Sequence, residues 1–287
     1  MVMKPITSYR PMSVDAVISR LSEEDCFILA GGTDAMVQHK SPRGAAAHFD
    51  KPIVFIDHLQ ELKQIYQIDH NLHIGACCTY KELLEHPLIP SILKKAIQEI
   101  AAPAIRNRGT IGGNICNASP AGDTLPLLYL YNALIRLRSA AGERVVEIRD
   151  FIQGPRRVFR LKDELVTEII VPVMPENRTR FVYEKVANRR ADAIAKLSFA
   201  ASIRVEEGKI EDVRFAFGAV GPTVLRSTEI EHKLTGQAIP LHNPLRNEIV
   251  ADFERLLKPI DDQRSTANYR RTVALRLLRH FLDSETR

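Results

Sequence analysis

Two glycine pairs flanked by hydroxyl, amide and carboxyl side chains are the part of this 287-residue chain best suited to binding chemistry. The first pair lies in the sequence AGGTD, residues 30–34, directly after the apolar residues 27–29. The second lies in TIGGN, residues 110–114, and an acidic residue, Asp123, follows it. Because glycine has no Cβ, backbone N–H groups in such turns can approach a diphosphate closely. The two turns therefore predict that a diphosphate-bearing ligand is held from two directions.

Each glycine pair on its own also fits a plain tight turn after a strand. Neither pair matches the Gly-x-Gly-x-x-Gly pattern of dinucleotide-binding folds, and neither matches the phosphate loop Gly-x-x-x-x-Gly-Lys-Ser/Thr. The sequence therefore disfavours both of those ordinary nucleotide-binding classes.

Three charged residues near these motifs have alternative roles. Asp123 precedes a run of leucines, so it suits a helix N-cap, and the same carboxylate can accept a hydrogen bond from a sugar hydroxyl. Asp34 would repel a diphosphate, so we expect it to accept from backbone or sugar donors. Lys185 lies on a predicted strand, where an exposed lysine is the ordinary expectation. No nucleophile set, carboxylate pair or metal-ligand spacing is present, so the sequence predicts no catalytic or metal-binding residue and a cofactor that carries the chemistry.

The predicted elements around the first motif form a small α/β unit. Ser13 caps a predicted helix, and residues 27–30 and 53–56 are predicted buried strands. This short β-α-β alternation favours a parallel sheet. Thr79 and Glu82 then form a capping box for a further helix, and a helix with an apolar face ends near residue 100.

The rest of the chain is predicted to contain more strands and to close with helices. The predicted strands are residues 72–76, 134–138, 144–148, 165–171, 181–187, 196–205 and 210–218. Residues 171–180 form a candidate linker, and Glu207-Gly208 suits a hairpin turn. The predicted closing helices are residues 228–234, 247–257 and 267–282, the last with Tyr269, Val273, Leu277 and Phe281 on one face.

Composition is ordinary for a globular protein, with 45% apolar and 26% charged residues. The net charge of +5 comes from scattered basic residues such as Arg156-Arg157, which are expected to be solvated surface rather than a nucleic-acid site. No apolar run approaches the roughly 20 residues that span a membrane, and the N-terminal residues lack a secretory signal. The four cysteines suit reduced thiols and not an iron–sulfur cluster. We therefore expect a cytoplasmic protein that binds neither membrane nor nucleic acid.

Taken together, AGGTD at residues 30–34 and IRNRGTIGGNICNASPAGDTLP at residues 105–126 resemble the FAD-binding medium subunit of the molybdenum hydroxylases, the xanthine dehydrogenase and carbon monoxide dehydrogenase type. The resemblance covers nearly the whole chain. It implies an α+β protein with an FAD-binding fold of the vanillyl-alcohol-oxidase type. A small α/β subdomain at residues 1–57 would be followed by a larger mixed-sheet subdomain at residues 58–175. Residues 176–287 would form a C-terminal domain with a three-stranded antiparallel sheet and three helices.

The resemblance also implies which residues surround a non-covalent FAD. It assigns the diphosphate and adenosine half to Leu29, Ala30, Gly31, Gly32, Thr33, Asp34, Gly109, Thr110, Ile111, Gly112, Gly113 and Asn114. It continues that wall with Asn117, Gly122 and Asp123, and it places Ile100, Leu165, Val166 and Lys185 around the cofactor, the lysine near the flavin.

The implied activity is that of an oxidoreductase subunit in a heterotrimer. A large partner subunit would hold the molybdenum cofactor and oxidise the substrate, for which a purine such as xanthine is a candidate. A small partner subunit with [2Fe-2S] clusters would pass the electrons to FAD in this chain, and from there they would reach NAD or another acceptor. Two alternatives remain: a self-sufficient FAD-dependent oxidoreductase of the same fold, and a nucleotide-binding scaffold without redox chemistry.

Overall fold

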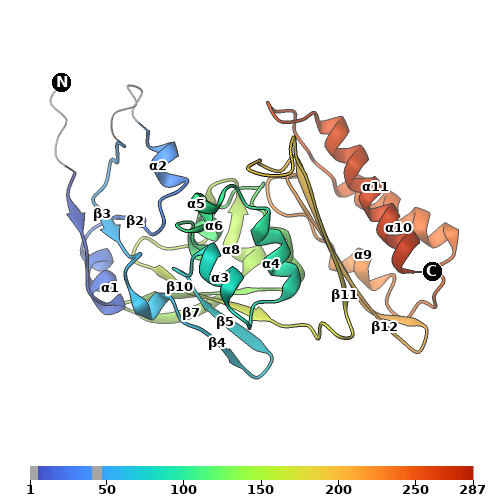
Figure 1. Ribbon diagram of the computed structural model, residues 1–287, viewed down its shortest axis with the longest axis horizontal. Coiled ribbons are helices and arrows are strands. Elements are labelled where there is room, and N and C mark those ends of the chain that lie inside the picture. Colours follow the sequence, from blue (N-terminus) through green and yellow to red (C-terminus); the bar gives the residue numbers. More distant parts are fainter. Residues whose placement is uncertain (1–5, 41–46, 287) are drawn as a thin grey trace.

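The chain folds into three successive units that lie side by side (Figure 1). The computed structural model describes residues 6–40 and 47–286, so residues 1–5 and 41–46 of the predicted domain at 1–57 lie outside the described part. Each unit is an α/β or α+β layer built on its own sheet. The observed architecture agrees with the α+β fold expected from the sequence.

The first unit is a three-stranded parallel sheet with one covering helix, as the β-α-β alternation predicted. Its elements are β1 (Ser8–Tyr9), α1 (Val14–Glu23), β2 (Phe27–Leu29), α2 (Ala35–Gln38) and β3 (Ile53–Phe55). The strand order is β1-β3-β2, with both pairings parallel. The Ser13 hydroxyl accepts from Ala16 N–H and caps α1, which buries Val17 and Leu21 against the sheet.

The second unit is a five-stranded sheet with helices on one face (Figure 1). Its helices are η1 (Gln60–Leu62), α3 (Tyr80–Glu85), α4 (Ser91–Gln98), α5 (Pro103–Arg106), α6 (Ile111–Asn117), α7 (Leu125–Leu130) and α8 (Ile148–Phe151). Its strands are β4 (Ile65–Ile68), β5 (Asn71–Gly75), β6 (Leu134–Ser139), β7 (Gly142–Glu147), β8 (Ile152–Gly154), β9 (Arg157–Val158) and β10 (Leu165–Pro172). The main sheet has the order β4-β5-β10-β6-β7. All of its pairings are antiparallel, whereas the sequence resemblance implied a mixed sheet.

The third unit is an antiparallel sheet covered by two long helices. It contains β11 (Arg180–Val186), β12 (Leu197–Glu206), β13 (Lys209–Gly218), α9 (Thr228–His232), α10 (Asn243–Leu256) and α11 (Ala267–Glu285). The strands lie in sequence order, and positive φ angles at Glu207 and Gly208 form the predicted hairpin turn. The predicted apolar face of the last helix is wrong at Tyr269, which is 42% exposed. Arg270 and Ala274 are buried instead, because the helix turns a neighbouring stripe toward the sheet.

Helix α7 joins the second unit to the third. All of its residues are buried, and it packs on β12 and β13. The core of the second unit accordingly includes Tyr183, Ala200 and Ala216 from the third-unit strands. The hydrophobic cores contain residues from both sides of residues 57 and 175, so they do not mark a domain boundary there. The predicted boundaries at these positions remain predictions.

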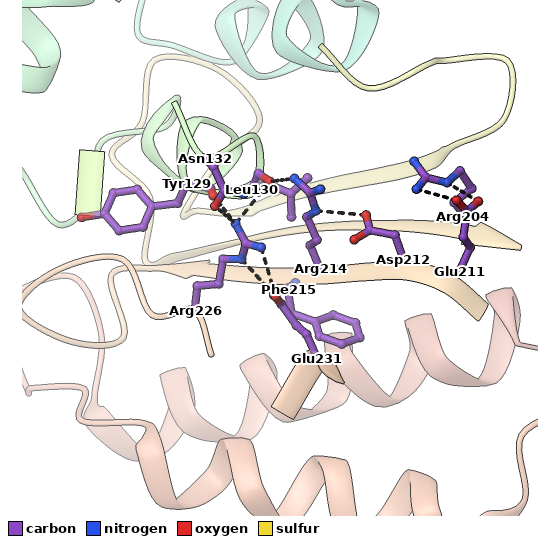
Figure 2. A network of polar contacts seen from close by, with 10 residues as sticks. All are labelled: Tyr129, Leu130, Asn132, Arg204, Glu211, Asp212, Arg214, Phe215, Arg226 and Glu231. Carbon is purple, nitrogen blue, oxygen red and sulfur yellow. Dashed lines mark hydrogen bonds and ion pairs between the residues drawn. The ribbon is translucent and has the colours of Figure 1, made fainter. Parts of the chain in front are cut away.

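Two arginines of the third unit bind the C-terminal end of α7 (Figure 2). Arg226 donates to the Tyr129 carbonyl at 2.5 Å, and Arg214 donates to the Leu130 carbonyl at 2.9 Å. Arg226 also pairs with Glu231 at 3.0 Å, and the two side chains are only 10% and 5% exposed. Burial raises the pKa of Glu231, and the facing arginine opposes that rise. The arginines thus donate hydrogen bonds to the last carbonyls of α7, which have no partner within the helix.

We expect Arg226→Met to lower the free energy of unfolding by about 3 kcal/mol, because it leaves the Glu231 carboxylate buried without its cation. Arg204→Met is the matched control, since Arg204 on β12 pairs with Glu211 on β13 of the same unit, where the glutamate is 43% exposed (Figure 2). The control should lose less than about 1 kcal/mol. Urea unfolding of both variants measures the difference. Equal losses of stability in the two variants would contradict a special contribution of the buried Arg226–Glu231 pair.

Candidate cofactor-binding site

A cavity of about 510 Å³ lies between the first and second units. It is lined by residues from β2 and the turn after it, from α6, and from the segments around Arg156 and Leu165. The predicted site residues that line it are Leu29, Ala30, Gly31, Gly32, Thr33, Asp34, Gly109, Thr110, Gly112, Gly113, Asn114, Asn117, Leu165 and Val166. Two motifs that are far apart in the sequence therefore form opposite walls of one space.

The first glycine turn lines this cavity and contains a row of backbone N–H groups without acceptors among the described residues. The chain leaves β2 and turns at Gly32, whose φ of +72° is a left-handed conformation that glycine adopts without strain. Within residues 6–40 and 47–286, no acceptor pairs with the N–H groups of residues 31–35. Successive unpaired N–H groups form a concave anion-binding surface. The turn therefore has the unpaired donors that a diphosphate needs, and the diphosphate itself stays a prediction.

The second glycine pair has a different role from the predicted one. It lies in the first turn of helix α6, which Thr110 caps through its hydroxyl. The N–H groups of Ile111, Gly112 and Gly113 are already bonded, to Cys78 O, Ala76 O and Thr110 Oγ1 respectively. The expectation that both glycine pairs offer N–H groups to the ligand is thus wrong for Gly112 and Gly113, because packing and capping use their donors.

The glycines themselves are explained by close packing. A Cβ on Gly31 would lie 1.8 Å from the Arg108 carbonyl oxygen, and one on Gly112 would lie 2.6 Å from the Ala76 carbonyl oxygen. Gly113 differs, because an added Cβ would meet only the Thr110 hydroxyl, at 2.8 Å. Gly31 and Gly112 therefore allow backbones to touch, while Gly113 leaves space at the cavity wall.

Polar side chains bridge the two walls at the rim of the cavity. Gln38 donates to the Asp34 carboxylate and, at 2.8 Å, to Asn117 Oδ1. Arg156 donates to the same Asn117 oxygen at 3.3 Å and lies 3.6 Å from Asp34. Asp34 does not cap α2 through its side chain. Its partners among the described residues are therefore these side chains; no backbone donor pairs with it, and the sugar donor that the sequence also allowed stays a prediction.

Asp123 and Lys185 form a buried ion pair outside the cavity. Lys185 Nζ lies 2.7 Å from Asp123 Oδ2 and also donates to the Glu99 carbonyl at 2.7 Å. The two side chains are 10% and 4% exposed, so the prediction of an exposed strand lysine is wrong. The predicted N-cap role of Asp123 is also wrong, since Thr124 precedes α7 and no side chain caps it. Burial raises the pKa of Asp123 to about 6, and Lys185 opposes this rise.

The other predicted residues lie near this ion pair or within the core. Ile100 is buried and follows Glu99, whose carbonyl Lys185 contacts. Gly122 precedes Asp123 in a turn. Ile111 is fully buried in the core of the second unit. The predicted site thus divides into a cavity group and a smaller group at the junction with the third unit.

Gln38, Tyr80 and Arg156 are among the cavity-lining residues that sequence reasoning missed. Arg156 was expected to be ordinary solvated surface. Its position depends on a hairpin tip with a φ of +57° and on its N–H, which donates to the Ala118 carbonyl. No local motif at Arg156 signals that contact.

Comparisons with known proteins agree with this geometry. Residues 4–174 match the family described as the FAD binding domain in molybdopterin dehydrogenase, and residues 182–284 match the carbon monoxide dehydrogenase flavoprotein C-terminal domain. The chain is 36% identical over 224 residues to the glyceraldehyde dehydrogenase medium chain of Sulfolobus acidocaldarius, covering 77% of this chain and 78% of that protein. It is 31% identical over 261 residues to the xanthine dehydrogenase FAD-binding subunit of Escherichia coli, covering 89% and 87%.

Solved structures have the same fold. Carbon monoxide dehydrogenase from Hydrogenophaga pseudoflava superposes with a TM-score of 0.87 at 26% identity, over 99% of this chain and 98% of that one. The enzyme from Oligotropha carboxidovorans superposes with a TM-score of 0.86 at 28% identity, over 98% and 97%. The likeness therefore extends over all three units.

The buried ion pair predicts a pH-dependent effect of removing its cation. The folded-state pKa of Asp123 is about 6, above its ordinary 3.8, so its contribution to stability is greatest below pH 4 and is lost as the pH rises through 6. Lys185→Met removes the opposing charge and raises this pKa further. We expect the FAD-free variant to lose about 3 kcal/mol of unfolding free energy at pH 8 and to regain much of it at pH 5.

Lys95→Met is the matched control for this experiment. Lys95 donates to the Tyr183 carbonyl and lies 3.6 Å from Glu184, but both of those charged side chains are about half exposed. Urea unfolding at the two pH values should show a small and pH-independent effect for the control. A Lys185 variant that behaves in the same way would show that the Asp123 charge is solvated.

Proposed function

Because this chain belongs to the FAD-binding subunits of the molybdenum hydroxylases, we propose that it is the electron-relay subunit of a three-subunit dehydrogenase. A large partner subunit with the molybdenum cofactor oxidises the substrate. A small partner subunit with [2Fe-2S] clusters delivers the electrons to FAD in this chain, and they leave for NAD or another acceptor. The observation that carries the proposal is the free donor row at residues 31–35, facing a cavity in a chain that matches an FAD-binding family.

The cavity fits the diphosphate and adenosine half of FAD. The free N–H groups of the first glycine turn supply donors for the diphosphate, and the wall around Gly113 leaves room beside them. Leu165 and Val166 supply apolar surface on the second unit. FAD is held without a covalent bond in this proposal.

We assign the flavin end of FAD to the junction with the third unit. Ile100, Asp123 and Lys185 gather there, and the lysine comes from a different unit than the other two. Asp123 Oδ1 is buried and has no hydrogen-bond partner among the described residues. A buried oxygen without a partner is available to accept a hydrogen bond from a polar group of the cofactor. Lys185 would then hold a positive charge near the cofactor and keep Asp123 ionised.

Bound FAD supplies the redox chemistry, since it can accept electrons from a cluster and release them to a second acceptor. The chain's own residues bind and orient the cofactor and exclude water from it. Substrate oxidation is assigned to the partner subunit.

Substrate, acceptor and location are the finer parts of the proposal. A purine such as xanthine is our candidate substrate, supported by the xanthine dehydrogenase relative. NAD is our candidate acceptor. The cytoplasm is our candidate location, supported by four free cysteines, among which burial raises the pKa of Cys77 to about 12. No helix in the described residues is long and apolar enough to cross a membrane.

Gly113→Val tests the placement of FAD. The valine would project from the cavity wall beside the Thr110 hydroxyl, so we expect loss of FAD with an intact fold. Gly221→Val is the control, because Gly221 lies outside the cavity and its added Cβ would meet nothing closer than 3.5 Å. Flavin absorbance and circular dichroism of both purified variants measure the outcome. Normal flavin content in the Gly113 variant would contradict the placement.

Metal analysis of the purified single chain tests the relay. We expect FAD, released intact by acid, with neither iron nor molybdenum. The chain alone should reduce dyes with NADH slowly and should not hydroxylate xanthine, because it holds only the last step of the path. Co-expression with two partner subunits should restore hydroxylation. Stoichiometric iron, or hydroxylation by the single chain, would favour the self-sufficient oxidoreductase, and a colourless folded chain would favour the scaffold.

A further inference from the structure

Arg156 stands at the mouth of the cavity, at the tip of the β8–β9 hairpin. Its N–H donates to the Ala118 carbonyl at 3.1 Å, which attaches the hairpin tip to the end of helix α6. Its guanidinium reaches across the rim toward Asp34, at 3.6 Å, on the first glycine turn. The side chain is 57% exposed and therefore free to change rotamer. Arg156 thus joins the second unit to the turn that carries the free donors.

The first glycine turn carries one negative side chain, Asp34, which would repel a bound diphosphate. Asp34 adds a carboxylate directly beside the N–H row of residues 31–35. A diphosphate bound to that row would meet this negative charge, and the repulsion weakens binding unless a cation stands nearby. The site therefore requires positive charge close to Asp34.

Among the lysine and arginine side chains, Lys51, Arg156 and Arg160 line the described part of the cavity, and Lys51 and Arg160 are bonded elsewhere. Lys51 pairs with Asp25 at 2.7 Å. Arg160 Nη1 donates to the carbonyl of Glu164 at 2.6 Å and to two neighbouring carbonyls. Both arginines use only Nη1, but Arg160 is held by carbonyls of its own loop, whereas Arg156 contacts two cavity-lining residues, Asn117 at 3.3 Å and Asp34 at 3.6 Å. The remaining donors of Arg156 are free among the described residues, and guanidinium donors suit phosphate oxygens.

We propose that Arg156 is a cofactor-binding residue that donates to the diphosphate of FAD and neutralises Asp34 beside it. The inference rests on the proposed position of FAD in this cavity. Gln38 and Asn117 hold the rim together through their own hydrogen bond, so the guanidinium can turn from the Asn117 oxygen to the diphosphate without opening the rim. The rest of the diphosphate is held by the N–H row.

The test compares Arg156→Met with Arg157→Met in the full-length chain. Arg157 is the neighbouring arginine on the same hairpin; it donates to the Gln153 carbonyl and does not line the cavity. Equilibrium dialysis with FAD, ADP and riboflavin separates the diphosphate from the flavin, since riboflavin has no phosphate. We expect Arg156→Met to raise the Kd for FAD and ADP about tenfold, which is about 1.4 kcal/mol, and to flatten their salt dependence. Riboflavin binding should not change, and Arg157→Met should resemble the unmodified chain.

Urea unfolding of the FAD-free variants separates binding from structure. If Arg156 serves only to strap the two units together, Arg156→Met lowers the unfolding midpoint and leaves the Kd for ADP unchanged, which overturns the proposal. Equal losses of affinity in both arginine variants would also overturn it, because they would indicate general surface charge. If the unmodified chain binds neither FAD nor ADP, the proposed function fails, independently of Arg156. Arg156→Lys should recover part of the ADP affinity, since it restores the charge without the fork of donors.

Discussion

The contact between Gly31 and the Arg108 backbone is the constraint on which the cavity depends. A Cβ on Gly31 would lie 1.8 Å from the Arg108 carbonyl oxygen, so only glycine lets the first unit approach the second this closely. Gly112 makes a comparable approach to Ala76. These contacts set the separation of the two walls. Because the N–H groups of Gly112 and Gly113 are used in packing and capping, the first glycine pair is the one of the two whose N–H groups have no acceptor among the described residues.

The third unit is fixed by polar contacts at both ends of helix α7. Lys185 reaches Asp123 just before the helix begins, and Arg226 and Arg214 reach the carbonyls at its end. Apolar packing of α7 on the C-terminal sheet fills the space between these contacts. A buried charge is stable only when it is paired and hydrogen-bonded, so each of these contacts favours one relative position of the two units. That position brings a lysine of the third unit to the wall of the second.

The two groups of site residues have opposite electrostatic character. The rim of the cavity is solvated, and its charges lie at hydrogen-bond distance from several neighbours. The Asp123–Lys185 pair is enclosed, and burial governs its protonation. A solvated rim suits the highly charged half of FAD, which must enter from water. An enclosed pair suits a redox centre whose charge the protein adjusts.

Local rules in the sequence determined most of the secondary structure and the family. The Thr79–Glu82 capping box, the Ser13 cap and the Glu207-Gly208 hairpin all form as predicted, because each involves residues a few positions apart. The glycine motifs predicted a diphosphate site because they too are made of residues a few positions apart. Tertiary structure alone decided the partner of Asp123, which lies 62 residues away, and the different roles of the two glycine pairs. It also placed Arg156 at the cavity rim. Such contacts depend on how the units pack, and no spacing within one segment records that packing.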